Sequence, residues 1–97
     1  VGGGKGCISV SANVAPRLDS NMQRAWREGR YQDAIDIQYR LMPLHDALFC
    51  ETSPGPVKYV AELLGICSAE ARLPICDISE ENKKKVRAAM VNVGLLN

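Results

Sequence analysis

One short segment has the pattern of a β-strand, and every apolar pattern after it is helical. Residues 7–11 carry apolar side chains at Cys7, Ile8 and Val10 and follow a glycine-rich run at residues 2–6. A lone strand has no ladder partner, and each backbone group buried without one costs about 1–3 kcal/mol. The sheet neighbours of this segment must therefore come from another chain or from residues that precede this sequence.

The first two helices are predicted from their apolar periodicity. One runs from about residue 16 to residue 28, and Gly29 ends it. The next runs from residue 31 to about residue 49, with apolar residues at spacings of 3, 4, 3 and 4. Pro43 lies inside this second helix, so we expect a kink just before it, near residues 39–42.

Two shorter helices complete the pattern. A turn cluster at residues 52–56 is followed by a helix that begins near Val57 and is closed by Gly65. Ser79 is the expected N-cap of the last helix, because two glutamates follow it in the first turn. Gly94 is expected to end that helix.

Composition favours one soluble domain and disfavours two classes of partner. The 97 residues are 46% hydrophobic, which suffices for a modest core. A net charge of +1 leaves no electrostatic footprint for nucleic acid or a membrane surface. No apolar run reaches the ~18 residues of a membrane span, and no signal peptide is visible. We therefore expect a cytoplasmic protein with neither nucleic acid nor a membrane as its partner.

The cysteines and the single histidine do not form a recognisable metal or catalytic motif. No C-x-x-C pair occurs, and a structural zinc site needs four ligands, so we expect no metal and no cofactor. His45 and Cys50 are five positions apart, which places them on different faces of a helix. Free, buried cysteines are the prediction. They are Cys7, Cys50, Cys67 and Cys76.

Three other motifs have simpler interpretations than chemistry. The glycines at residues 2–6 precede a strand, whereas a phosphate-binding loop follows one. The basic run at residues 83–85 lies one turn after Glu80 and Glu81, as on a solvated helix face. Asp33 and Asp36 are expected to face solvent. The residues by themselves complete no catalytic constellation.

Several motifs follow one another along the whole chain. They are G-C-I-S-V at residues 6–10, R-L-M-P-L-H at 40–45, P-G-P-V-K at 54–58, R-L-P at 72–74 and G-L-L at 94–96. In this order and spacing they resemble the C-terminal third of the dihydrodipicolinate synthase family of pyruvate-dependent class I aldolases. One departure is Ser53, which stands where many relatives have asparagine.

The resemblance implies an α/β fold, the C-terminal portion of a (β/α)8 TIM barrel with an added C-terminal helical region. Residues 1–29 would be the last β/α unit, with residues 7–10 as the eighth strand, and residues 30–97 a three-helix region. This piece would be mostly α by itself. A barrel needs ~250 residues, so most of it would precede this sequence. A chain that begins with Val1 in a glycine-rich run is consistent with a cut end.

The resemblance also implies an activity for the complete protein. Family members are lyases that condense pyruvate with aspartate semialdehyde through a Schiff-base lysine, in lysine and diaminopimelate biosynthesis, and they are typically homotetramers. No catalytic residue of the family matches this chain, so the chain by itself is expected to be inactive, and Lys5 and Lys58 do not take the catalytic role. The matching site residue is Ile8, whose main-chain carbonyl would lie beside the Schiff base and pyruvate.

Two alternatives stay open at this point. Sister aldolases that act on N-acetylneuraminate or keto-deoxy sugar acids share the barrel and the lysine. A non-enzymatic helical module is the other alternative, with its N-terminal strand added to the sheet edge of a partner protein.

Overall fold

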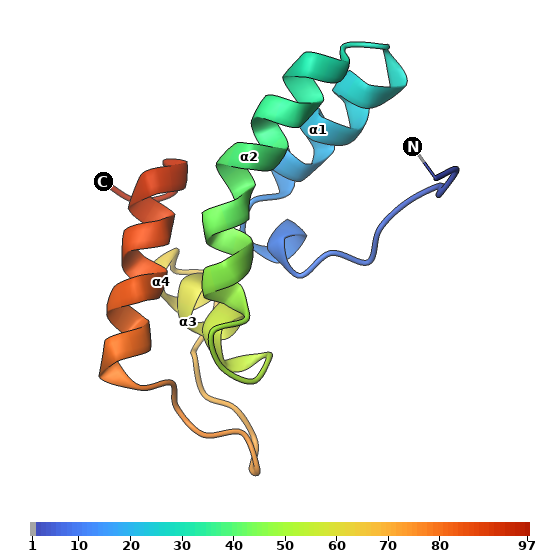
Figure 1. The fold of residues 1–97 in the computed structure, drawn as a ribbon. Helices are drawn as coiled ribbons and strands as arrows, with labels where there is room; N and C mark the ends of the chain where they lie inside the picture. Colours follow the sequence, from blue (N-terminus) through green and yellow to red (C-terminus); the bar gives the residue numbers. More distant parts are fainter. Residues whose placement is uncertain (1) are drawn as a thin grey trace.

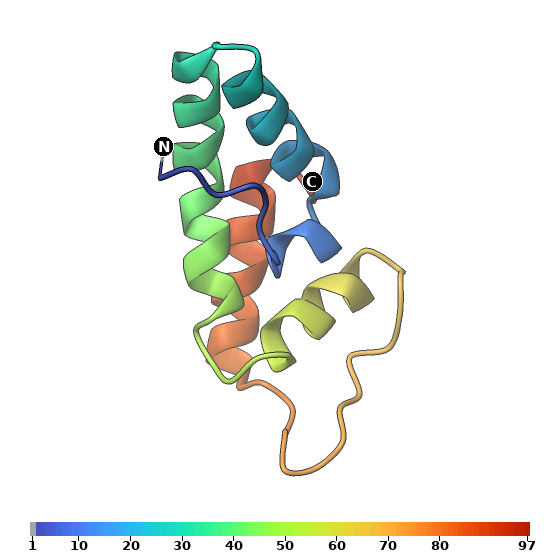
Figure 2. The same ribbon diagram turned by 90° about the vertical axis from the view of Figure 1, so that its right-hand side faces the viewer.

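Helix α2 is the centre of the fold and contacts every other helix (Figure 1). The computed structural model describes residues 2–97. Its α1 and α2 form an antiparallel pair, α4 lies along the C-terminal half of α2, and α3 packs beside both (Figures 1 and 2). The elements are η1 (Ser11–Asn13), α1 (Pro16–Arg27), α2 (Tyr31–Leu48), α3 (Gly55–Leu63) and α4 (Glu80–Val93).

The predicted strand at residues 7–11 does not form in this chain. Residues 2–10 have no regular secondary structure, and Ser11 begins the 3-10 turn η1. Figure 1 shows this segment leaving the helices toward the N-terminus. A strand exists only in a ladder, and the described part of the chain contains no other strand to pair with it. The lack of a partner is the difficulty already visible in the sequence.

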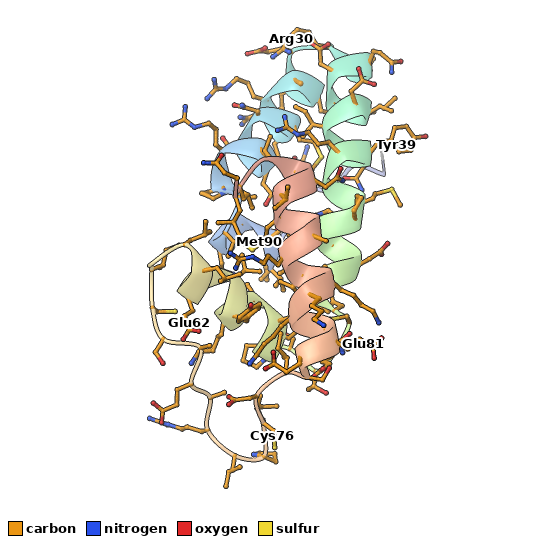
Figure 3. All side chains as sticks on the ribbon, turned by 90° about the vertical axis from the view of Figure 1, so that its left-hand side faces the viewer. Arg30, Tyr39, Glu62, Cys76, Glu81 and Met90 are labelled. Atoms are coloured by element: carbon orange, nitrogen blue, oxygen red, sulfur yellow. The ribbon has the colours of Figure 1, made fainter. Side chains whose placement is uncertain are left out.

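The core is an apolar layer between α2, α3 and α4. Met90 lies in this layer, whereas the side chains of Tyr39 and Glu81 point away from it (Figure 3). Burying a side chain of this size contributes about 1.5–3 kcal/mol. The large side chains that are at most 1% exposed include Leu41, Leu44, Leu48, Val60, Val86, Met90 and Val93.

Pro43 lies within α2, which continues through it as one helix. A proline lacks the N–H that would bond to the carbonyl four residues earlier, here the carbonyl of Tyr39. Tyr39 lies on an exposed face of α2, at 68% exposure. Figure 1 shows the axis of α2 changing direction along its length, in line with the predicted kink.

Helix α3 begins two residues before the predicted start. Pro56 lies in its first turn, where a missing N–H costs nothing. Gly55 precedes it because a Cβ at this position would lie 3.0 Å from Cγ2 of Ile78. The close approach of the segment that leads into α4 therefore favours glycine at this position.

Both predicted ends of α4 are confirmed. Ser79 is the N-cap, and its Oγ accepts a hydrogen bond from the Asn82 N–H at 3.2 Å. Gly94 ends the helix with φ of +85°, a left-handed conformation that favours glycine. The solvated basic face is confirmed as well, because Lys83 pairs with Glu80 at 2.7 Å and Lys85 with Glu81 at 3.0 Å.

The predicted burial of the cysteines is wrong. All four are free thiols, but three are exposed and Cys50 is only partly buried. Cys67 and Cys76 lie in the long connection between α3 and α4, which is mostly exposed (Figure 3). Apolar neighbours in the sequence did not indicate burial here, because this connection does not pack into the helical core.

No helix among residues 2–97 is both long and apolar enough to cross a bilayer.

The carboxylates of Asp33 and Asp36 are exposed, as expected, and bond to Arg30 and Gln32 respectively.

Candidate functional site

The predicted site residue, Ile8, lies on the segment that precedes η1. Its side chain is fully exposed, at 106%. The Ile8 carbonyl takes part in no hydrogen bond within residues 2–97. An exposed apolar side chain beside an unbonded carbonyl is typical of a segment that lacks the neighbouring strands of a sheet.

A groove of about 440 Å³ runs between this segment and the first two long helices. Lys5, Cys7 and Ser9 line one side, and residues of α1 and α2 line the other. His45 is the α2 residue at its inner end, next to Ser11. The groove therefore brings together the N-terminal segment and the α1–α2 pair.

Ser11 is the centre of a polar cluster at the inner end of this groove. It is only 3% exposed, and its Oγ lies 2.8 Å from Ser9 Oγ. The same Oγ lies 2.9 Å from Asp19 Oδ2 on α1 and 3.2 Å from His45 Nε2 on α2. Ser9 Oγ in turn accepts the N–H of Ala12 at 3.1 Å. Side chains from three separate segments therefore converge on one hydroxyl.

Counting protons fixes the direction of these bonds. A serine hydroxyl has one proton, and the Asp19 carboxylate can only accept, so Ser11 donates to Asp19. The remaining lone pairs of Ser11 Oγ then accept, which makes His45 Nε2–H a donor. His45 is thus assigned the form protonated at Nε2.

This cluster does not have the arrangement of a nucleophilic triad. In a triad the acid orients the histidine and the histidine takes the proton of the serine. Here Asp19 bonds directly to Ser11, and the histidine donates. Ser11 is also buried, so its hydroxyl does not attack a substrate. The arrangement instead fixes the backbone position of residues 9–11.

Sequence reasoning missed this cluster. The sequence suggests Cys50 as a possible partner of His45, whereas the structure pairs His45 with Ser11, 34 positions earlier. The one available signal is the presence of Ser9, Ser11 and the first-turn Asp19 around the start of a helix, and this signal is weak because polar side chains are common there.

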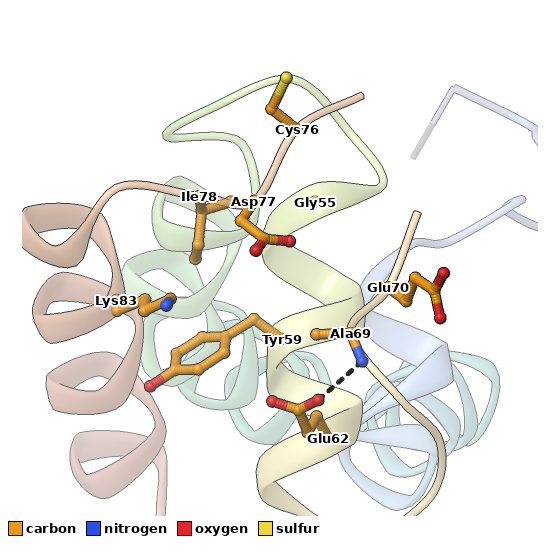
Figure 4. Close-up of a pocket in the computed structure, with 9 residues that line it drawn as sticks. All are labelled: Gly55, Tyr59, Glu62, Ala69, Glu70, Cys76, Asp77, Ile78 and Lys83. Atoms are coloured by element: carbon orange, nitrogen blue, oxygen red, sulfur yellow. Dashed lines mark hydrogen bonds between the residues drawn. The ribbon is translucent and has the colours of Figure 1, made fainter. Parts of the chain in front are cut away.

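A second, smaller hollow of about 250 Å³ lies between α3, the start of α4 and the connection that joins them (Figure 4). Glu62 accepts the Ala69 N–H there at 2.9 Å, and Lys83 lies 5.8 Å from the centre of the Tyr59 ring. The first contact holds the connection against α3, and the second joins α4 to α3. Within the part of the chain that the structure describes, no three His, Cys, Asp or Glu side chains gather as a metal site would require.

Known proteins are similar to this chain over almost its whole length. Residues 1–93 match the model of the dihydrodipicolinate synthetase family. The 4-hydroxy-tetrahydrodipicolinate synthase of Gluconacetobacter diazotrophicus is 54% identical over 95 residues, which are 98% of this chain and 32% of that protein. The enzyme of the same name from Parvibaculum lavamentivorans is 56% identical over 95 residues, 98% of this chain and 33% of that protein.

Solved structures give the same result for the fold. The crystal structure of dihydrodipicolinate synthase from Thermotoga maritima matches with a TM-score of 0.93 at 37% identity, over 97% of this chain and 32% of that one. This mostly helical chain matches part of a solved dihydrodipicolinate synthase, and this match confirms the predicted fold class. The chain spans about a third of the length of the curated relatives it matches.

Proposed function

Because the chain belongs to the dihydrodipicolinate synthetase family, we propose that it is the C-terminal part of a lyase that condenses pyruvate with aspartate semialdehyde. The observation that carries the proposal is the 54% identity to a 4-hydroxy-tetrahydrodipicolinate synthase over 98% of this chain. The product would enter lysine and diaminopimelate biosynthesis. We propose the cytoplasm as its location and a homotetramer as its assembly, both by analogy with the family.

In the complete protein, residues 7–10 would form the last strand of a (β/α)8 barrel and α1 would cover that strand. Residues 1–29 would then be the last β/α unit, and residues 30–97 the added helical region. The exposed Ile8 side chain supports this placement, because the rest of the barrel would cover it, and the unbonded carbonyl is available to face a substrate.

The Ile8 carbonyl would act on the Schiff-base amine and on pyruvate. A carbonyl oxygen carries partial negative charge and favours the protonated form of a nearby nitrogen. A fixed dipole of this kind also orients the keto acid without reorganising during the reaction.

The lysine that forms the Schiff base would lie outside this chain. Lys58 is engaged elsewhere, because its ammonium bonds to the Glu70 carbonyl oxygen. Lys5 lies on the exposed N-terminal segment, at the rim of the groove. We therefore expect the chain by itself to be inactive.

Reductive trapping tests the proposal. The complete protein is treated with pyruvate and borohydride and then mapped by mass spectrometry. We expect one covalent adduct on a lysine outside this segment, together with consumption of aspartate semialdehyde in the untreated enzyme. An adduct on Lys5 or Lys58 would contradict the assignment, and turnover of N-acetylneuraminate or a keto-deoxy sugar acid in preference would select a sister enzyme.

A further inference from the structure

We infer that Ser11, held between Asp19 and His45, is a positioning residue that sets the direction of the Ile8 carbonyl and with it the binding of pyruvate. This inference rests on the proposed function, in which that carbonyl faces the substrate. Ser11 does not touch the substrate in this account. It acts through Ser9, which shares a peptide plane with the Ile8 carbonyl.

The first step is the connection from Ile8 to Ser11. The Ile8 carbonyl carbon and the Ser9 nitrogen belong to one rigid peptide unit, so the carbonyl direction follows the backbone of Ser9. Ser9 is held through its hydroxyl, which accepts the Ala12 N–H at 3.1 Å and lies 2.8 Å from Ser11 Oγ. Movement of Ser11 would therefore turn the peptide unit that carries the carbonyl.

The second step is the connection from Ser11 to the two helices. Asp19 in the first turn of α1 accepts the Ser11 hydroxyl at 2.9 Å, and His45 of α2 donates to it at 3.2 Å. His45 follows directly on Leu44, which is fully buried in the core. The serine is thus fixed between two elements that are themselves rigid, as a precise site requires.

The third step is that the turn does not need this cluster in order to form. The carbonyl of Ser11 already accepts the N–H groups of Val14 at 3.0 Å and of Ala15 at 2.7 Å. These backbone bonds maintain η1 without the Ser11 hydroxyl. The hydroxyl instead fixes the position of residues 9–11 relative to α1 and α2. This position determines the direction of a carbonyl that faces a substrate.

Substitutions in the complete enzyme test the inference. We expect Ser11→Ala to lower kcat/KM for pyruvate roughly tenfold and to slow borohydride trapping by a similar factor, since small misplacements near the reacting centre are costly. The KM for aspartate semialdehyde should stay within about twofold of the unsubstituted value. Ser11→Thr keeps the hydroxyl and should restore most of the activity toward pyruvate.

Ser79→Ala is the matched control, because it removes a hydroxyl of the same kind from the N-cap of α4, outside the groove. It should lower stability and leave the KM for pyruvate unchanged.

If Ser11→Ala does not fold, two substitutions of His45 test the same serine through its hydrogen-bond donor. His45→Gln keeps an N–H donor and should resemble the unsubstituted enzyme, whereas His45→Leu should share the pyruvate defect.

The outcomes separate the inference from the proposed function. Trapping of the unsubstituted enzyme together with unchanged pyruvate kinetics in both Ser11→Ala and His45→Leu would overturn the positioning role alone. Failure of the unsubstituted enzyme to be trapped would overturn the proposed function and this inference with it.

Discussion

The guanidinium of Arg40 on α2 donates a hydrogen bond to the carbonyl oxygen of Val93, the last residue of α4, across 2.7 Å. The carbonyl groups at the end of a helix have no partner within it, and a cation is favoured there by the helix dipole. Arg40 therefore satisfies one of these groups and ties the end of α4 to α2.

Replacing Arg40 with methionine should loosen the last turn of α4. The apolar stem is kept while the hydrogen bond and the charge are lost, so we expect a local loss of about 1 kcal/mol. Amide hydrogen exchange of the complete protein would show faster exchange near Val93 and unchanged exchange near Glu80. Equal protection of both ends in the variant would contradict the contact.

Gly94→Ala should cost more than the same change at Gly29. Both glycines have positive φ, +85° and +78°, and alanine is strained at either position by about 1 kcal/mol. At Gly94 the new Cβ would also lie 3.1 Å from Arg40 Nη2, whereas at Gly29 it meets no atom within 4 Å. Thermal unfolding of the complete protein would measure the two losses.

The Arg40→Met background provides the control for that comparison. With the guanidinium absent, Gly94→Ala should cost no more than Gly29→Ala, because only the backbone strain remains. An additive double variant would show that the close approach to Arg40 has no energetic effect.

Helix ends were predictable from the sequence because their determinants are local. Ser79 and Gly94 act within one helical turn of their own positions, so the residues themselves indicate the boundary. The reason for glycine at the start of α3 was not predictable, because it depends on Ile78 approaching Gly55 from 23 positions away in the chain. The kink-prone Pro43 was recognised, and the surrounding apolar spacing correctly indicated one continuous helix.

Glu51 should make the start of α4 sensitive to acid. Its carboxylate accepts the Asn82 side-chain amide at 2.6 Å and the Ser79 N–H at 2.9 Å, and these bonds lower its pKa. A lowered pKa in the fold means stability that is present above the ordinary value of 4.5 and is lost as pH falls through the lowered one. After correction for the intrinsic exchange rate, amide protection around Ser79 should therefore decrease as the pH falls below 4.5.

Glu51→Gln isolates this contribution. The amide oxygen still accepts, but the group no longer titrates, so the variant should lose part of the acid dependence around Ser79. Some dependence should remain, because the bond to Lys83 also lowers the pKa of Glu80. Glu81→Gln, on the exposed face, serves as the matched control. Identical pH profiles for Glu51→Gln and the unsubstituted protein would rule out the proposed role of Glu51.

The cysteines should differ in their reactivity toward alkylating agents. Partial burial, and to a smaller degree the charge of Glu51, raises the pKa of the Cys50 thiol, so less of it is thiolate at neutral pH. Cys67 and Cys76 are exposed on the α3–α4 connection. A time course of iodoacetamide labelling followed by peptide mass spectrometry should show Cys50 modified last. The order should vanish in denaturant, and early labelling of Cys50 in the folded protein would contradict its burial.

The role of Ile8 as a site residue stays a prediction. Ile8 was identified through the resemblance to the family, whereas the cluster that supports it was not, because Ser11 and His45 meet only through tertiary packing. The composition of residues 7–10 suits a strand, but the hydrogen bonds of a strand need partners that local sequence does not provide. The sequence pattern indicates which residues are candidates for a strand or a site. It does not indicate which distant residues will contact them.

The position of α4 in the chain has a consequence for synthesis on the ribosome. Leu41, Leu44 and Leu48 of α2 are buried partly by Val86, Met90 and Val93, which are translated some 40 residues later. Until residue 93 has left the exit tunnel, the part of the apolar face of α2 that α4 buries stays uncovered, and nascent chains with such faces are prone to aggregate. Chaperone binding should therefore be strongest on nascent chains that end between α2 and α4.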